Sequence, residues 1–153
     1  MGIPECYQCG HIQHGGTNYR SRCVKCQKGF LAAHTKIVVA GGRSYTNYEV
    51  MATALDHLFS EAIGRRECIM IVSGAAKGAD VLGERYAAER EYELLRMPAQ
   101  WDTFGKSAGY KRNVEMANVA NGVVVFWDGE SKGAKHMIDI AESKNLPTRI
   151  IHY

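Results

Sequence analysis

Four cysteines near the start of the chain have the spacing of a metal site. Cys6, Cys9, Cys23 and Cys26 form a C-x2-C-x13-C-x2-C pattern, in which two pairs of thiolates can surround one zinc ion tetrahedrally. The segment around them has too few large apolar side chains to bury a core, so the metal would supply its folding free energy. The pattern predicts structural Zn2+ in a zinc ribbon at residues 1–30. Two disulfides are the alternative, which a cytosolic location disfavours.

A second stretch, I-M-I-V-S-G-A-A-K-G-A-D from Ile69 to Asp80, has the residues of a phosphate site. Its four apolar residues predict a strand buried on both faces, and small residues follow where the strand passes into a helix. Bare backbone at a helix N-terminus can hold phosphate, Lys77 could add a cation, and Asp80 could accept hydrogen bonds from a ribose. No G-K-[S/T] ends the turn, so it is not a P-loop. The candidate ligand contacts in this stretch are Ser73, Gly74, Ala75, Lys77, Gly78 and Asp80.

Three further turns follow predicted strands and carry residues that could also contact a ligand. The sequence places them after residues 36–40, after the strand that ends at Met97, and after residues 122–127. A helix over residues 108–120 brings two more polar side chains near its start. The carboxyl ends of parallel strands meet at one edge of a sheet, so these residues are expected to converge there. The additional candidate ligand contacts are Gly41, Gly42, Arg43, Pro98, Trp101, Arg112, Asn113, Trp127, Asp128, Gly129, Ser131 and Gly133.

The elements that would position these residues alternate along the chain. Apolar runs predict strands, and apolar residues at helical spacing predict helices between them, with a loop after Pro98. This alternation predicts an α/β fold, a Rossmann-like doubly wound parallel sheet of about five strands, with the small zinc ribbon before it. The predicted strands cover 36–40, 69–72, 92–97, 122–127 and 148–151, and the predicted helices cover 48–63, 77–90, 108–120 and 135–144.

Length and composition fit this organisation. The chain has 153 residues, 46% hydrophobic and 23% charged, which is typical of a globular protein. It accommodates the ribbon, a linker at 31–36 and one Rossmann-like domain at 37–153. No apolar run is long enough for a membrane span and no signal peptide opens the chain, so we expect a cytoplasmic location without membrane contact. The net charge is +3, and the excess of Lys and Arg lies in the N-terminal segment.

Five motifs follow one another in the second part of the chain. They are A-G-G-R-S-Y (40–45), S-G-A-A-K-G-A-D (73–80), P-A-Q-W (98–101), A-G-Y-K-R-N-V-E-M (108–116) and F-W-D-G-E-S-K-G-A-K-H-M-I (126–138). In this order they resemble the motifs of the SLOG superfamily, and the branch they most resemble is the YspA-type, YpsA-related proteins often found in bacteria and phages. The resemblance covers residues 36–153. It implies a Rossmann-like domain that binds nucleotides or ADP-ribose-like molecules, in a bacterial cell or a phage-infected host.

The enzymes of that superfamily, the Lonely Guy phosphoribohydrolases, cleave the N-glycosidic bond of nucleoside monophosphates. Arg112 and Met116 match their R-K-x-x-M motif, but Met137 stands where their P-G-G-x-G-T-x-x-E motif has its catalytic glutamate. An oxocarbenium-like transition state needs a carboxylate, so this departure argues against the same mechanism. The catalytic residues, if there are any, remain open, and the candidates are Arg112, Asp80, Glu84 and Asp128.

Three functions therefore follow from the sequence. The first is sensing or sequestration of a nucleotide or a nucleotide-derived ligand such as an ADP-ribose-like molecule. The second is a nucleotide or ADP-ribose N-glycosidase that lacks the usual glutamate. The third is nucleic-acid binding through the basic, aromatic surface of the ribbon, since DNA-processing protein A is another member of the superfamily. The ribbon could instead contact a protein, and we expect a homo-oligomer.

Overall fold

The computed structural model describes residues 34–64 and 68–153. The predicted zinc ribbon, with all four of its cysteines, lies outside the described residues. β1 begins at His34, so the last three residues of the predicted linker belong to that strand.

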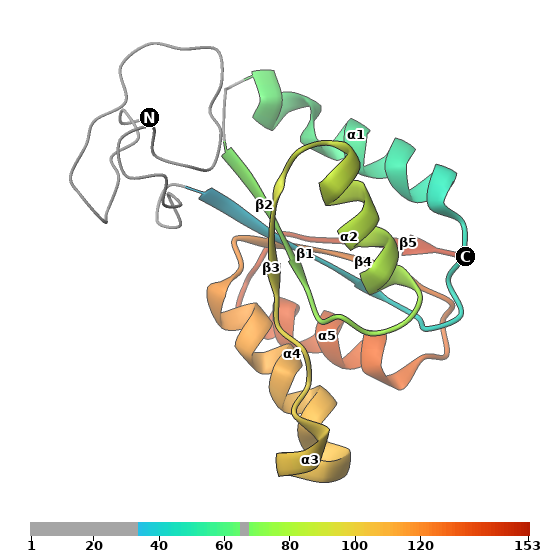
Figure 1. The fold of residues 1–153 in the computed structure, drawn as a ribbon, viewed down its shortest axis with the longest axis vertical. Coiled ribbons are helices and arrows are strands. Elements are labelled where there is room, and N and C mark those ends of the chain that lie inside the picture. The colour runs from blue at the N-terminus through green and yellow to red at the C-terminus, as the bar shows by residue number, and fades with distance from the viewer. Residues whose placement is uncertain (1–33, 65–67) are drawn as a thin grey trace, which may run out of the picture.

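Five parallel strands form the centre of the domain. They are β1 (His34–Gly41), β2 (Cys68–Ser73), β3 (Glu93–Arg96), β4 (Gly122–Trp127) and β5 (Thr148–His152). Their order across the sheet is β3-β2-β1-β4-β5 (Figure 1). The predicted Rossmann-like parallel sheet is confirmed, because five parallel strands are joined in chain order by helical crossovers, and the central strands are short apolar runs.

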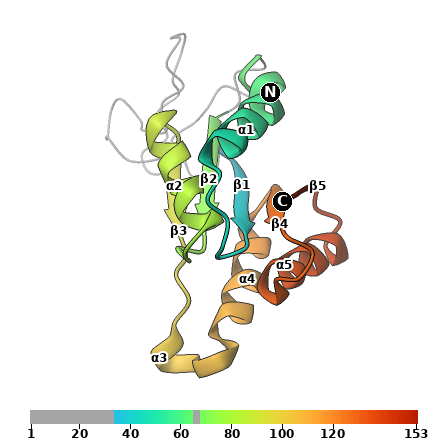
Figure 2. The same cartoon turned by 90° about the vertical axis from the view of Figure 1, so that its right-hand side faces the viewer.

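Helices cover both faces of this sheet. α1 (Tyr48–Gly64) and α2 (Ala79–Glu89) pack on one face, and α4 (Ala108–Val119) and α5 (Lys132–Ser143) pack on the other (Figure 2). Successive residues of the central strands alternate between the two apolar cores, as Val38 and Val39 do. Period-two alternation between two buried faces explains why these strands read as unbroken apolar runs.

Two short helices occupy the segment that the sequence predicts as a loop. α3 (Trp101–Phe104) and the 3-10 helix η2 (Gly105–Ser107) follow β3 and lead into α4. Figure 1 shows α3 at one end of the domain, beyond the carboxyl edge of the sheet. The helices α2 and α5 also differ from prediction by two or three residues at their starts. Among the described residues, none of the helices has the length and apolarity needed to cross a bilayer.

Candidate functional site

A cleft of about 490 Å3 opens at the carboxyl edge of the sheet. It lies between the turns that follow β1 and β4, which are neighbours whose crossovers run to opposite sides, so this is the topological switch point where open α/β sheets bind ligands. Its volume is in the range of roughly 300–1,000 Å3 typical of small-molecule sites. The cleft is lined by Ala40, Gly41, Gly42, Arg43, Ser44, Ala76, Asp80, Trp101, Lys106, Gly109, Tyr110, Arg112, Asn113, Met116, Asp128, Ser131, Gly133, Ala134 and Met137.

One wall of the cleft is built from two glycine turns that pack against each other. The Ala79 amide donates to the Gly42 carbonyl at 3.3 Å, and Gly78 has a φ of 81°. A Cβ on Gly78 would lie 2.7 Å from the backbone of Arg43, so no other residue fits there without displacing that turn. Gly78 therefore brings α2 against the β1–α1 turn and does not itself line the cleft.

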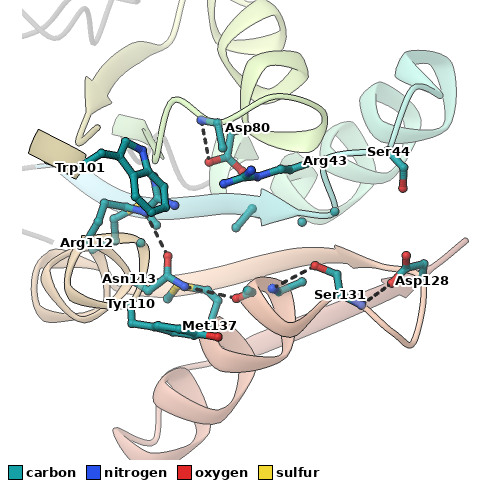
Figure 3. Close-up of a pocket in the computed structure, with 18 of the residues that line it drawn as sticks. Arg43, Ser44, Asp80, Trp101, Tyr110, Arg112, Asn113, Asp128, Ser131 and Met137 are labelled. Carbon is teal, nitrogen blue, oxygen red and sulfur yellow. Dashed lines mark hydrogen bonds between the residues drawn. The ribbon is translucent and has the colours of Figure 1, made fainter. Parts of the chain in front are cut away.

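Two arginines converge on the cleft from its two sides. Arg43 follows β1, and Arg112 lies in α4, where its guanidinium donates to the Gly74 carbonyl and, at 3.1 Å, to the Asn113 side chain (Figure 3). Burial lowers the pKa of Arg112, the charge of Asp80 opposes this shift, and the positive charge of Arg43 adds to it. Neither arginine forms a salt bridge with a carboxylate among the described residues. Two neighbouring arginines beside a single carboxyl leave an excess of positive charge that suits an anion.

Asp80, in the first turn of α2, is the buried carboxyl of the cleft. Its side chain is 3% exposed and accepts a hydrogen bond from the Ala76 amide at 3.3 Å. Burial raises the pKa of Asp80 to about 6, against the opposing attraction of Arg112. A carboxyl kept in this setting is typical of functional sites.

The second wall comes from α4 and from the start of α5. Asn113 is 6% exposed, and its amide nitrogen lies 3.2 Å from the Gly133 carbonyl and 3.2 Å from Nδ1 of His136. An amide nitrogen can only donate, so Nδ1 of His136 is the acceptor, and burial lowers the pKa of this histidine in favour of that neutral form. These bonds tie α4 to α5 and hold Asn113 where it supports Arg112.

The turn before α5 is closed by its own side chains. Oδ1 of Asp128 accepts from the amides of Glu130 at 2.9 Å and Ser131 at 2.8 Å, and these bonds lower the pKa of Asp128. Ser131 caps the helix by accepting from the Ala134 amide at 3.4 Å. Asp128 is therefore ionised and committed to the turn, at the mouth of the cleft (Figure 3).

The structure brings more than half of the predicted ligand contacts together. Those that line the cleft are Gly41, Gly42, Arg43, Asp80, Trp101, Arg112, Asn113, Asp128, Ser131 and Gly133. The others lie outside the lining, namely Ser73, Gly74, Ala75, Lys77, Gly78, Pro98, Trp127 and Gly129. Gly74 lies directly behind it, because a Cβ there would be 2.7 Å from Oδ2 of Asp80.

Of the four catalytic candidates, Glu84 is placed apart from the other three. Its carboxylate accepts from the Ser73 hydroxyl at 2.8 Å and from Nε of Arg96 at 3.0 Å, and it does not line the cleft. The buried Ser73 hydroxyl accepts in turn from the Ala75 amide at 3.0 Å. Glu84 and Ser73 thus fix the turn after β2.

Nine of the lining residues are not among the ligand contacts predicted from the sequence. Met116 and Met137 belong to the family motifs, and this membership could have predicted them as lining residues. Lys106 and Tyr110 lie within one or two helical turns of Arg112, so their positions relative to that arginine could have predicted them. The small residues had no signal beyond their motifs. The nine are Ala40, Ser44, Ala76, Lys106, Gly109, Tyr110, Met116, Ala134 and Met137. Within residues 34–64 and 68–153, no group of three or more His, Cys, Asp or Glu side chains is placed to hold a metal.

Comparisons with known proteins agree with the fold. The Gene 61 protein of Mycobacterium phage D29 is 29% identical over 119 residues, covering 73% of this chain and 92% of the phage protein. DNA processing protein A from Streptococcus pneumoniae superposes with a TM-score of 0.62 at 18% identity, over 78% of this chain and 50% of that one. DNA processing protein A from Helicobacter pylori, described with a single-stranded DNA binding mode, superposes with a TM-score of 0.54 at 17% identity. This superposition covers 85% of this chain and 69% of the Helicobacter protein.

The chain thus spans half the length of the pneumococcal protein, and at these identities the two structures establish a shared fold. A family model matches part of the chain by sequence. Residues 35–104, from β1 to the end of α3, match the model of the YspA, cpYpsA-related SLOG family. With the doubly wound sheet and the cleft at its switch point, this match makes the described domain similar to the YspA, cpYpsA-related SLOG family over just under half of the chain.

Proposed function

We propose that the cleft binds a nucleotide or a nucleotide-derived ligand, such as an ADP-ribose-like molecule, and holds it without cleaving it. The observation that carries the proposal is the pair of arginines, Arg43 and Arg112, which face a cleft at the switch point beside a single buried carboxyl, that of Asp80. Planar guanidinium groups bind the oxygens of a phosphate in bidentate geometry. The family match supports the proposal.

Other groups in the cleft suit the rest of a nucleotide. α5 starts at the cleft with Ser131, Gly133 and Ala134 in the lining, so the positive end of its dipole faces the bound anion. Lys106 adds a third cation at the opening. The Asp80 carboxyl, on the same side as Arg43 in Figure 3, is suited to accept hydrogen bonds from ribose hydroxyls.

Met137 is the reason to propose binding rather than cleavage. It is 1% exposed, lines the cleft from α5, and occupies the place of the glutamate in the related phosphoribohydrolases. A thioether cannot stabilise an oxocarbenium-like transition state as a carboxylate does. Asp128 is committed to its turn and Glu84 lies outside the lining, which leaves Asp80 as the buried carboxyl of the cleft.

The first experiment measures binding. Calorimetry with AMP and ADP-ribose should give a complex with the full-length protein, and Arg43→Ala or Arg112→Ala should each weaken it by about 10- to 100-fold, the effect of losing a charge-assisted hydrogen bond of about 1.5–3 kcal/mol. Arg149→Ala, at an exposed arginine of β5 outside the cleft, is the matched control. Equal weakening in all three variants, or none in the first two, contradicts the assignment of the site.

The second experiment follows the bound nucleotide. AMP and ADP-ribose recovered from the protein after prolonged incubation should be intact, with less than one free base per chain by chromatography. Base release over many turnovers would overturn the binding function. In that case Asp80→Asn should abolish release while retaining binding if Asp80 stabilises the transition state.

A second function, single-stranded DNA binding, is favoured by one observation. Trp101, Lys106 and Tyr110 line the cleft and are all exposed, and aromatic side chains beside cations are the usual surface for single strands. The Helicobacter protein of the same fold is described with single-stranded DNA. An oligothymidylate should then bind with an affinity that falls steeply between 50 and 200 mM salt, by about a thousandfold or more if six or more phosphates are contacted. Absence of this salt dependence excludes the second function.

A further inference from the structure

The segment that carries Trp101 is ordered without apolar burial. None of the residues of α3 or η2 is buried. Backbone hydrogen bonds hold the turn instead, since the amides of Thr103 and Phe104 donate to the Gln100 carbonyl at 3.1 and 3.0 Å. The segment therefore adds little to the core, and its exposed aromatic side chains need another explanation.

Trp101 itself is half-exposed and turned to the cleft. Its side chain is 49% exposed, and it lines the cleft together with Arg43, whose guanidinium carbon lies 6.0 Å from the indole centroid. The far edge of the indole rests against α4 at Gly109, where an added Cβ would lie 3.3 Å from Cη2. The glycine lets the ring lie close to α4 at the mouth of the cleft (Figure 3).

The neighbouring aromatic rings are engaged by other groups. Phe104 has the Lys111 ammonium 4.0 Å from its ring centroid, and Tyr110 packs edge-on against His136 at 4.4 Å. Trp127, which also follows a strand at this edge, donates from Nε1 to the Ser131 carbonyl at 3.1 Å and lies outside the lining. Among these four rings, Trp101 offers the most exposed surface to the cleft.

We propose that the Trp101 indole is a stacking platform for the base of the ligand, with the phosphate held by Arg43 and Arg112. This rests on the proposed nucleotide binding and specifies the ligand class. Because Arg43 and the indole are close, one nucleotide can contact both with its phosphate and its base. The site then selects nucleotides with an accessible base over phosphosugars and inorganic phosphates, since only a base can cover the exposed indole.

Tryptophan fluorescence tests this contact directly, because the chain has two tryptophans. In Trp127→Phe, whose melting temperature is first checked against the unaltered protein, Trp101 is the single reporter. AMP and ADP-ribose should quench and shift its emission on binding, whereas ribose 5-phosphate and pyrophosphate should bind without quenching. Quenching by an oligothymidylate with none by the mononucleotides would overturn the assignment to a nucleotide-sized ligand.

Affinities separate this proposal from the one on which it rests. Trp101→Ala should weaken AMP binding by about 5- to 100-fold, the effect of losing one stacked base, while leaving ribose 5-phosphate binding unchanged. Trp101→Phe should recover most of the affinity, and Phe104→Ala, outside the lining, should change nothing. AMP binding that is unaffected in Trp101→Ala overturns the platform alone. Failure of the unaltered protein to bind any of the probes overturns both proposals.

Discussion

Asp80 shows what a single residue costs the folded domain. Its pKa is raised from the ordinary 3.8 to about 6, chiefly by burial, so the folded chain binds this proton more tightly than the unfolded chain. The stability that results is complete below pH 3.8 and is lost as the pH rises through about 6. At neutral pH the domain therefore holds a buried charge at a cost of about 3 kcal/mol, which follows from a pKa change of about two units.

Asp80→Asn should remove this cost. We expect the melting temperature to rise by several degrees at pH 7.5 and to change little at about pH 3.5, where the aspartic acid is neutral in the folded chain and largely neutral in the unfolded chain. Thermal melts of both proteins at the two pH values measure the effect. A rise of the same size at both pH values would show that the charge is not its cause.

For single residues, the sequence predicts which side chains lie near the carboxyl edge of the sheet better than it predicts which groups they contact. The arginine after β1 and the one near the start of α4 reach the same cleft as expected, because both flank the carboxyl edge. Ser73 and Trp127 also flank it, but their polar atoms are taken by Glu84 and by the Ser131 carbonyl. Such partners depend on tertiary contacts, which local pattern does not contain.

A polar network joins α1 to α2 on the face of the sheet away from α4 and α5. Tyr86 is fully buried and donates its hydroxyl proton to Oδ1 of Asp56 at 2.7 Å. Arg90 donates to the same carboxylate at 3.0 and 2.8 Å, and these bonds are the main cause that lowers the pKa of Asp56. Burial, reinforced by the bond to Asp56, raises the pKa of Tyr86. The network fixes the angle between two helices that are also joined by a hydrogen bond from the Tyr48 hydroxyl to Glu89.

Tyr86→Phe should lower the free energy of unfolding by about 1 kcal/mol, the net value of one hydrogen bond, because Asp56 keeps its bonds to Arg90. Urea unfolding of both proteins measures this difference in the free energy of unfolding. Tyr153→Phe removes an exposed hydroxyl that lies 3.1 Å from the Ser44 hydroxyl, so it should have almost no effect. A loss well above 2 kcal/mol for Tyr86→Phe would mean that the helices repack.

Helices and strands can be predicted from the sequence where their buried residues give a regular spacing of apolar side chains. The strands of the sheet were found within two residues because their apolar runs are bounded by glycine or polar turns. α3 was not found, since four residues without a buried side chain produce no period. The segment that carries Trp101 to the cleft therefore has no signal of its own in the hydrophobic pattern.

For the whole molecule, the predicted zinc ribbon remains a proposal that can be tested apart from the domain. The apolar cores described above draw on residues from Ile37 to Ile151, so we expect the domain to melt at the same temperature after metal removal. Elemental analysis should give about one zinc per chain, and Cys23→Ser should lower it. A chain purified without zinc that still protects Cys6 and Cys9 from alkylation would contradict the prediction.

The residues that match the family model form one wall of the cleft, and the other wall lies beyond them. The matched residues 35–104 include Arg43, Asp80 and Trp101, whereas Arg112, Ser131 and Met137 lie beyond them. The wall within the matched segment carries the proposed base platform and one phosphate contact. The wall beyond it carries the second arginine and Met137.

The strand order also determines when the cleft can form as the chain is synthesised. β1 is the central strand, and one of its two neighbours, β4, comes late, so that the Lys36 amide donates at 2.8 Å to the Asn121 side chain, 85 residues further along. Until β4 emerges from the ribosome, the nascent chain has one wall of the cleft and an unpaired apolar edge on β1. Fragments that end before Gly122 should aggregate and bind no nucleotide, and a nucleotide can stabilise only chains that are complete through α5.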